Sequence, residues 1–165
     1  MTVFLRVLTY SVLWAGFGVV SGWVANRCPD GLFANDSVVT RIRSFERCGR
    51  WYEHLHIRAW KSRLPEAGAV FEGGVSKASL PGFEPGQLGV LARETRRAEW
   101  VHLANIGFGC TFVIWQPWNI ALVMAVFGIV VHLPFVMVQR YNRARVLRVI
   151  DRSRARLAVT GPMPT

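Results

Sequence analysis

The sequence predicts an all-α integral membrane protein with about three transmembrane helices and one amphipathic helix at the membrane surface. Hydrophobic residues make up 52% of the 165-residue chain, although 18% of it is charged, and the two kinds of residue alternate in blocks. Such blocks are typical of a small membrane protein. The length favours one domain, which we place at residues 1–157. Residues 158–165 are expected to form a flexible tail.

The formal net charge of +10 comes almost entirely from arginine. A soluble nucleic-acid-binding protein would also be basic. Here, however, the arginines flank apolar runs, which fits anionic lipid headgroups better. We therefore expect membrane lipids as partners and no nucleic acid. The three cysteines show no CxxC or Cys/His spacing, which argues against a disulfide framework and a zinc site. No metal is expected.

The first predicted span covers residues 3–25, an apolar run long enough for a transmembrane helix. A cleaved signal peptide is the rival interpretation. The long apolar run, the single early basic residue Arg6 and the lack of an A-x-A site argue against it. A lipoprotein signal is also disfavoured, because Asn26 and Arg27 precede Cys28 in place of small residues. We expect an uncleaved helix.

Residues 27–98 are predicted to form a cytoplasmic interfacial segment. Within it, residues 38–61 have apolar side chains at three- or four-residue steps, interspersed with arginines and bordered by aromatics. A basic, aromatic-rich helix beside a membrane helix commonly lies in the interface. An ordinary helix packed on a core is the alternative. Residues 67–85 are rich in glycine and proline and are read as a loop.

A further helix is predicted over residues 87–106. At about 100° per residue, Thr95, Glu99 and His102 fall on its otherwise apolar face. A carboxylate and an imidazole on such a face are costly unless they are paired. Because Glu99 and His102 are three residues apart, we expect them to pair with each other.

Two more spans are predicted at residues 101–116 and 119–138, joined by a short aromatic turn. Pro134 is expected to kink the last span. On that helix His132, Gln139 and Arg143 share a face, with Asn142 to one side. A hairpin of two spans would bring residues 94–102 and 139–143 together at one membrane face.

The distribution of basic residues predicts the topology. Twelve lysines and arginines lie between the first and second spans, seven follow the third span, and the turn at residues 116–119 has none. The positive-inside rule then places the N-terminus outside and the C-terminus in the cytoplasm of a multi-pass protein of the cell membrane.

The polar clusters predict a chemistry. A carboxylate bonded to one imidazole nitrogen makes the other a better base, so Glu99 would orient His102, and His102 would take a proton from a sugar or lipid hydroxyl. Arg140, Asn142 and Arg143 are placed to stabilise an oxyanion or bind a phosphate. The structural alternative is that Glu99 and His102 neutralise each other while the arginines hold lipid phosphates.

The chain resembles the glycosyl-4,4'-diaponeurosporenoate acyltransferases, a family that esterifies a fatty acyl group onto the sugar of a glycosylated carotenoid acid. Four strings carry the resemblance, in order: Trp60-Lys61-Ser62-Arg63-Leu64-Pro65-Glu66, Val75-Ser76-Lys77, Glu94-Thr95-Arg96-Arg97-Ala98-Glu99-Trp100-Val101-His102, and Leu133-Pro134-Phe135-Val136-Met137-Val138-Gln139-Arg140-Tyr141-Asn142-Arg143. The N-terminal third and the arginine-rich tail show no such string.

The resemblance implies an acyl donor, acyl-CoA or acyl carrier protein, as co-substrate without a further cofactor. It also implies a lipid-soluble acceptor, an ester product and partner membrane enzymes. Together with the residues above, it indicates His102 and Glu99 as catalytic. The expected substrate-binding residues are Arg140, Asn142, Arg143, Gln139, Arg96, Thr95, Lys61 and Glu66.

Two other classes of function compete with an acyltransferase. A non-catalytic membrane module would use the same arginines to hold anionic lipid or anchor a partner enzyme. A transporter subunit or small channel fits less well, because three spans leave little room for a pore unless the protein oligomerises.

Overall fold

A computed structural model describes residues 3–64 and 85–159, and every regular element in these ranges is helical. The long helices are α1 (Val3–Arg27), α4 (Pro85–Thr111) and α5 (Trp118–Val159). The short elements are α2 (Gly31–Ala34), the 3-10 segments η1 (Ser44–Leu55), η2 (Lys61–Arg63) and η5 (Phe112–Ile114), and α3 (Ile57–Trp60). Of the predicted loop at 67–85, residues 67–84 lie outside the described residues, as does the candidate Glu66, and Pro85 begins α4.

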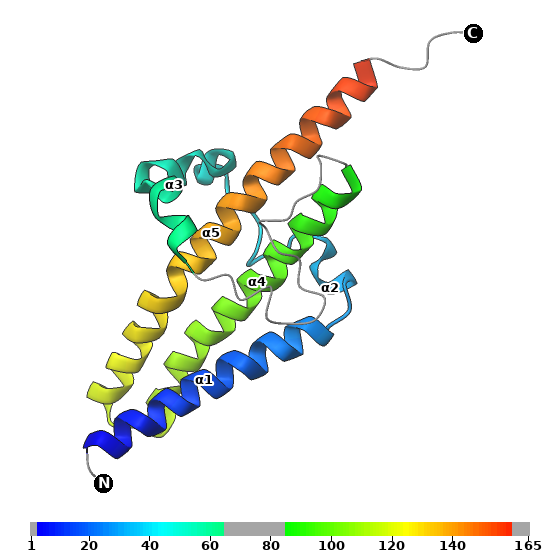
Figure 1. Cartoon of the computed structure of the whole chain (residues 1–165). Coiled ribbons are helices and arrows are strands. Elements are labelled where there is room, and N and C mark those ends of the chain that lie inside the picture. Colours follow the sequence, from blue (N-terminus) through cyan, green and yellow to red (C-terminus); the bar gives the residue numbers. More distant parts are fainter. Residues whose placement is uncertain (1–2, 65–84, 160–165) are drawn as a thin grey trace.

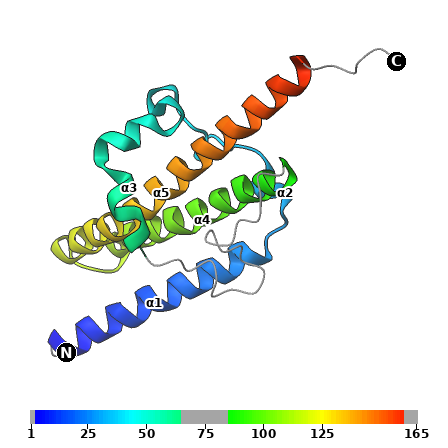
Figure 2. The same ribbon diagram turned by 45° about the horizontal axis from the view of Figure 1, so that its top comes forward.

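Helices α4 and α5 form an antiparallel hairpin, and α1 lies along α4 (Figures 1 and 2). Polar contacts set the direction of α1. The Tyr10 hydroxyl donates to Gln116 Oε1 at 3.0 Å, beside the hairpin turn, and Asn105 Nδ2 donates to Ser21 Oγ at 2.9 Å further along. The N-terminus of α1 therefore lies at the same end of the molecule as the α4–α5 turn.

Close packing of α1 against the hairpin depends on two glycines beneath Trp14. A Cβ added at Gly109 would lie 2.8 Å from the Met124 carbonyl oxygen and 3.2 Å from the Trp14 ring. A Cβ at Gly128 would lie 2.9 Å from the same ring. Only glycine leaves room for this approach, because real Cβ atoms do not come so close to backbone or a packed ring.

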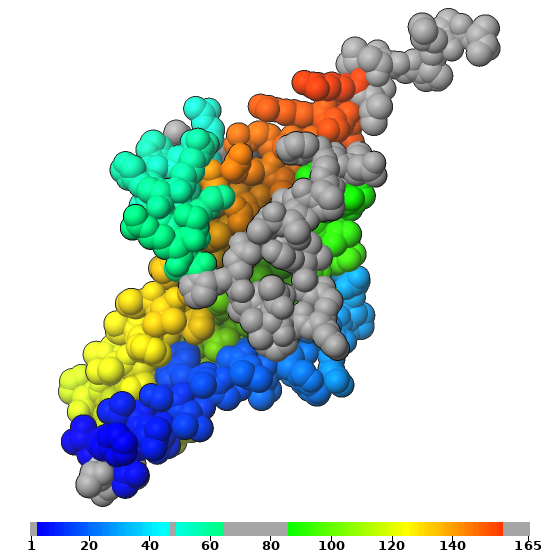
Figure 3. All heavy atoms as spheres, in the orientation of Figure 1, coloured from blue at the N-terminus to red at the C-terminus, as the bar shows by residue number. Residues whose placement is uncertain are grey.

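Two helices in the described part of the chain are long and apolar enough to cross a membrane: Val3–Arg27 and Trp118–Arg156. Many of their large apolar side chains face outward, at the end of the molecule that Figure 3 colours blue and yellow. The predicted span 101–116 is not among the two. Its part within α4, from Val101 to Thr111, covers only about 16 Å at 1.5 Å per residue, and the bilayer core is about 30 Å thick.

The predicted amphipathic helix over residues 38–61 is broken into shorter pieces. Residues 44–55 form the 3-10 segment η1, and His56 then adopts a left-handed conformation with φ of 50°. Helix α3 and segment η2 follow. This region packs on α5, where Tyr52 and Ile57 form a buried cluster with Val138 and Tyr141. Tertiary packing against α5 thus replaces the continuous helix that the periodicity predicted.

Helix α5 continues through Pro134 as one element. Its 42 residues span about 63 Å, twice the thickness of a bilayer core. The apolar part ends near Val138, and the arginine-rich half extends beyond it. The polar clusters on α4 and α5 face each other where this change of character occurs.

Candidate functional site

Glu99 on α4 has no exposed surface, and its carboxylate is held by two arginines of α5. Arg140 Nη1 donates to Glu99 Oε1 at 2.7 Å, and Arg143 Nη2 forms an ion pair with Glu99 Oε2 at 2.6 Å. The predicted meeting of residues 94–102 with residues 139–143 is confirmed by these contacts. These two positive charges offset the cost of burying the carboxylate, although within the described residues Oε2 makes no hydrogen bond.

The predicted partner of Glu99 was His102, and the structure gives Glu99 these arginine partners instead. The reason lies in the register of the hairpin. Arg140 and Arg143 come level with Glu99, whereas His102 lies one helical turn further toward the apolar end of α4. Glu99 thus links α4 to α5 through its ion pairs with these two arginines.

Arg140 joins three parts of the chain. Besides Glu99, its guanidinium contacts Glu46 of η1, with Nε 3.3 Å from Oε2 and a second, shorter bond through Nη2. Its Nη1 and Nη2 donate to the carbonyl oxygens of Val39 at 3.1 Å and Arg41 at 2.8 Å. The predicted oxyanion donor is therefore occupied by protein groups and works as a cross-link.

Glu46 and Tyr52 complete this part of the cluster. Burial acts to raise the pKa of Glu46, but the bonds from Arg140, the Arg43 backbone N–H and the Tyr52 hydroxyl hold it below its ordinary value. Burial and the neighbouring Glu46 raise the pKa of Tyr52. Glu46 is therefore an ionised carboxylate, and Tyr52 is a neutral hydrogen-bond donor.

Arg143 is fully buried yet incompletely bonded. Its Nη2 is ion-paired with Glu99 and donates to the Thr40 carbonyl oxygen, and its Nε lies 3.9 Å from Asp36 Oδ1. Within the described residues its Nη1 and Nε have no hydrogen-bond partner, and of the two only Nε has a carboxylate nearby. Buried donors without acceptors are rare in native structures, so Nη1 is the best-placed donor in the cluster for a bound oxygen.

Other predicted binding residues serve neighbouring contacts. Arg96 donates to Asp36 Oδ1 at 2.6 Å and reaches the carbonyl oxygens of Phe33 and Ala34 at 3.3 Å. Thr95 is buried and donates to the Ala92 carbonyl oxygen at 2.7 Å, a bond within its own helix. Both residues support the fold around the cluster.

Lys61 and Asn142 are brought together at the edge of the cluster. Lys61 Nζ donates to Asn142 Oδ1 at 3.3 Å and lies 5.1 Å from the centre of the Tyr141 ring. Both side chains are partly exposed, and the neighbouring Gln139 is buried. This edge is where a polar headgroup could reach the predicted residues.

His102 meets a second histidine, His132 of α5. The two Nδ1 atoms are 3.2 Å apart. The His102 ring stacks on Phe135 with centroids 4.6 Å apart, and the His132 ring stacks on Trp14 of α1 at 5.8 Å. The histidine pair and its aromatic neighbours therefore come from all three long helices. The pair lies next to the ion cluster, toward the apolar end of α4 and α5.

Sequence reasoning missed Asp36, Thr40, Glu46 and Tyr52. Their segment carries no motif, and their placement depends on how residues 36–52 fold back over α5. His132 was visible as a polar residue inside an apolar run, but its partner was not. In the described part of the chain no group of three or more His, Cys, Asp or Glu side chains could hold a metal ion.

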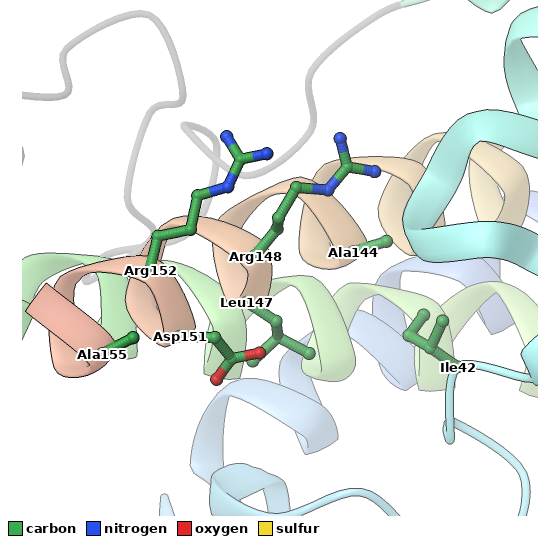
Figure 4. Close-up of a pocket in the computed structure, with 7 residues that line it drawn as sticks. All are labelled: Ile42, Ala144, Leu147, Arg148, Asp151, Arg152 and Ala155. Atoms are coloured by element: carbon green, nitrogen blue, oxygen red, sulfur yellow. The ribbon is translucent and has the colours of Figure 1, made fainter.

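An open groove of about 380 Å³ runs along the C-terminal half of α5. Its apolar lining includes Ala144 and Leu147 of α5 together with Ile42 from the preceding segment. In Figure 4, Arg148 and Arg152 stand side by side on one side of the helix, while Leu147 and Asp151 point to the other. The groove begins next to Arg143 in sequence and leads away from the cluster toward the basic end of the molecule.

The family model described as glycosyl-4,4'-diaponeurosporenoate acyltransferase matches residues 35–152. That range covers more than half of the chain. The chain belongs to this acyltransferase family. Among its relatives, an enzyme of that name from Staphylococcus haemolyticus is 29% identical over 84% of this chain and 81% of its own length. One from Staphylococcus aureus is 24% identical over 78% and 80%. No solved structure matches the chain.

The acyltransferase family match encloses the whole candidate site. Glu46, Glu99, His102, His132, Arg140 and Arg143 all fall within it. Helix α1 precedes the matched residues, so Trp14 is the contact to the histidine pair that comes from outside them.

Proposed function

We propose that the protein is a membrane-bound acyltransferase that esterifies a fatty acyl group onto a hydroxyl of a glycosylated carotenoid or a related glycolipid. The observation that carries the proposal is the acyltransferase family match over residues 35–152, which encloses a histidine beside a buried arginine–glutamate cluster. The substrate class follows from the names of the relatives. Two helices apolar enough to cross a membrane fit a lipid-soluble acceptor.

In the proposed reaction His102 is the general base. Its Nδ1 faces His132, so Nε2 is the ring nitrogen that meets the substrate. Nε2 takes the proton of the sugar hydroxyl as that oxygen attacks the thioester carbonyl carbon. A C–O bond forms, the C–S bond breaks, and the departing thiolate takes the proton from the imidazolium. Ester and free thiol are the products.

Arg143 is the proposed donor to the oxyanion or to the sugar. Its Nη1 has no hydrogen-bond partner within the described residues, and its charge is held beside Glu99. His102 lies one turn from Glu99, roughly 4.5 Å along the helix axis, so base and donor belong to one region. A buried, fixed donor is the kind that stabilises developing charge best. Arg140, Glu99 and Glu46 hold the region in place.

The remaining expected contacts lie at the edge of the cluster. Lys61, Asn142 and Gln139 are proposed to meet the polar end of the acceptor. Thr95 and Arg96 support α4, given their bonds to Ala92 and Asp36. Glu66 stays a prediction, since it lies outside the described residues.

The acyl donor is proposed to approach along the α5 groove. Acyl-CoA and acyl carrier protein both present the acyl group on a phosphate-bearing phosphopantetheine arm. The groove offers an apolar floor, with Arg148 and Arg152 as partners for a phosphate. Its basic surroundings also fit a cytoplasmic C-terminus and an outside N-terminus in the cell membrane. Membrane enzymes that deliver the acceptor are the expected protein partners.

A non-catalytic lipid-binding module is the second candidate, and one observation favours it. The three central arginines, Arg96, Arg140 and Arg143, have three carboxylate partners, Asp36, Glu46 and Glu99. Such a balanced network is also what a purely structural cross-link requires. Purified protein in vesicles, given acyl donor and a glycosylated carotenoid, separates the two. Ester detected by mass spectrometry supports the enzyme; vesicle binding without ester supports the module.

A further inference from the structure

Two imidazoles that face each other through the same ring atom constrain each other. His102 on α4 and His132 on α5 bring their Nδ1 atoms to 3.2 Å. A neutral imidazole has one N–H donor and one bare acceptor nitrogen. A hydrogen bond between the two Nδ1 atoms therefore requires opposite tautomers, with one ring protonated at Nδ1 and the other at Nε2.

The orientation of both rings is fixed by aromatic neighbours. His102 stacks on Phe135 at an interplanar angle of 20°, and His132 stacks on Trp14 at 21°. The four rings come from α1, α4 and α5. Glu99, which would have been the usual kind of partner for a catalytic imidazole, is held by Arg140 and Arg143.

We propose that His132 is a positioning residue for the acyl transfer: its Nδ1 accepts the hydrogen bond of His102 Nδ1–H and so keeps Nε2 of His102 free of its proton for use as the base. This inference rests on the proposed function, because it assigns His132 a role through His102. When His102 Nε2 takes the substrate proton, its charged Nδ1–H bonds more strongly to His132. The proton stays on His102 until the thiolate takes it, and His132 remains neutral throughout.

The test compares His132→Asn with His132→Leu. The two side chains have nearly the same shape, but only asparagine places an acceptor where Nδ1 of His132 lies. In vesicles with a thioester donor and a glycosylated carotenoid, we expect His132→Leu to lower kcat by roughly 10- to 100-fold, the size of effect seen when a metal-ligating histidine loses its hydrogen-bond partner. Its KM should be unchanged. His132→Asn should retain kcat within about threefold, since the base keeps its orientation.

A double variant separates a role through His102 from general damage. If His132 acts only through His102, His132→Leu adds no further loss in a His102→Ala background. Equal amounts of inserted protein and equal melting temperatures are required of all variants. Wild-type kcat in His132→Leu, an equal loss in His132→Asn, or an additive loss in the double variant would each overturn the inference.

Failure of the proposed function has a different signature. If His102→Ala alone forms ester at the wild-type rate, His102 is not the base and the assignment of the reaction fails. If His102→Ala is inactive while His132→Leu is fully active, only the role of His132 fails.

Discussion

Glu99 and Arg140 lie 41 residues apart in sequence and are joined at 2.7 Å across the interface between α4 and α5. Glu99 is fully buried, and Arg143 holds its other oxygen. Removing one partner of a buried ion pair costs far more stability than replacing both partners by apolar residues, because an uncompensated charge stays buried. Variants of this cluster therefore test how much the ion pairs stabilise the packing of α4 on α5.

Glu99→Gln removes the carboxylate that is ion-paired with both Arg140 and Arg143. We expect the free energy of unfolding to fall by about 3–5 kcal/mol, the usual cost of breaking a buried pair. Thermal unfolding in detergent measures it. The control is Glu53→Gln, whose partner Arg58 is exposed and which should change little. An unchanged melting temperature in Glu99→Gln would contradict the cross-link.

Acid should weaken the contact between η1 and α5 through Glu46. Burial raises the pKa of Glu46, but the bonds from Arg140, Arg43 and Tyr52 lower it further, so the folded pKa lies below the ordinary value of 4.5. The ionised form is thus favoured by folding, so its contribution is fully present above the unfolded pKa and is lost as the pH falls through the folded pKa. Melting temperatures between pH 7 and pH 3 should drop steeply below about 4.5, the same ordinary value. In Glu46→Gln the fall in melting temperature on acidification should be smaller. The same dependence of melting temperature on pH in wild type and Glu46→Gln would contradict this role of Glu46.

Two glycines of α4 should respond oppositely to alanine. In Gly109→Ala the new Cβ meets the Met124 carbonyl oxygen and the Trp14 ring, and we expect a loss of about 1–3 kcal/mol from overpacking. Gly107 has nothing within 4 Å of an added Cβ. Gly107→Ala should therefore be neutral or gain up to about 1 kcal/mol from helix propensity. Equal effects in the two variants would show that α1 does not pack as described.

The α5 groove predicts a change in donor binding alone. Arg152→Glu reverses a charge in the lining, and we expect KM for the acyl donor to rise about tenfold with kcat unchanged, as for a lost charge-assisted bond. Arg154→Glu is the matched control, since it makes the same charge change on the same exposed turn without lining the groove. A rise of KM in both variants would indicate only a general electrostatic effect.

Sequence reasoning reached the parts of this structure that depend on local pattern. The apolar runs gave α1 and the first half of α5, and the helix over residues 87–106 lies within α4. It also placed Glu99 near Arg140 and Arg143, because a hairpin must bring those clusters together. The predicted second span, residues 101–116, is not among the helices that are long and apolar enough to cross a membrane.

The partners of the site residues could not be predicted from the sequence, because they depend on how the helices are aligned against one another. Helical spacing allows Glu99 to pair with His102, yet the facing helix decides the matter by presenting two guanidiniums to Glu99 and His132 to His102. The same holds for Glu46, whose role depends on the break at His56 and on the 3-10 path of η1 over α5. No periodicity in residues 38–61 contains that information.

Ester formation by a His102→Gln variant shows whether His102 is the base of an acyl transfer. Wild-type and variant protein, inserted in equal amounts into vesicles with acyl donor and glycosylated carotenoid, are compared by mass spectrometry of the lipid extract. We expect wild type to form the ester and His102→Gln to form it at least about 100 times more slowly, the contribution of a general base. Ester formation by His102→Gln at the wild-type rate would show that His102 is not the base.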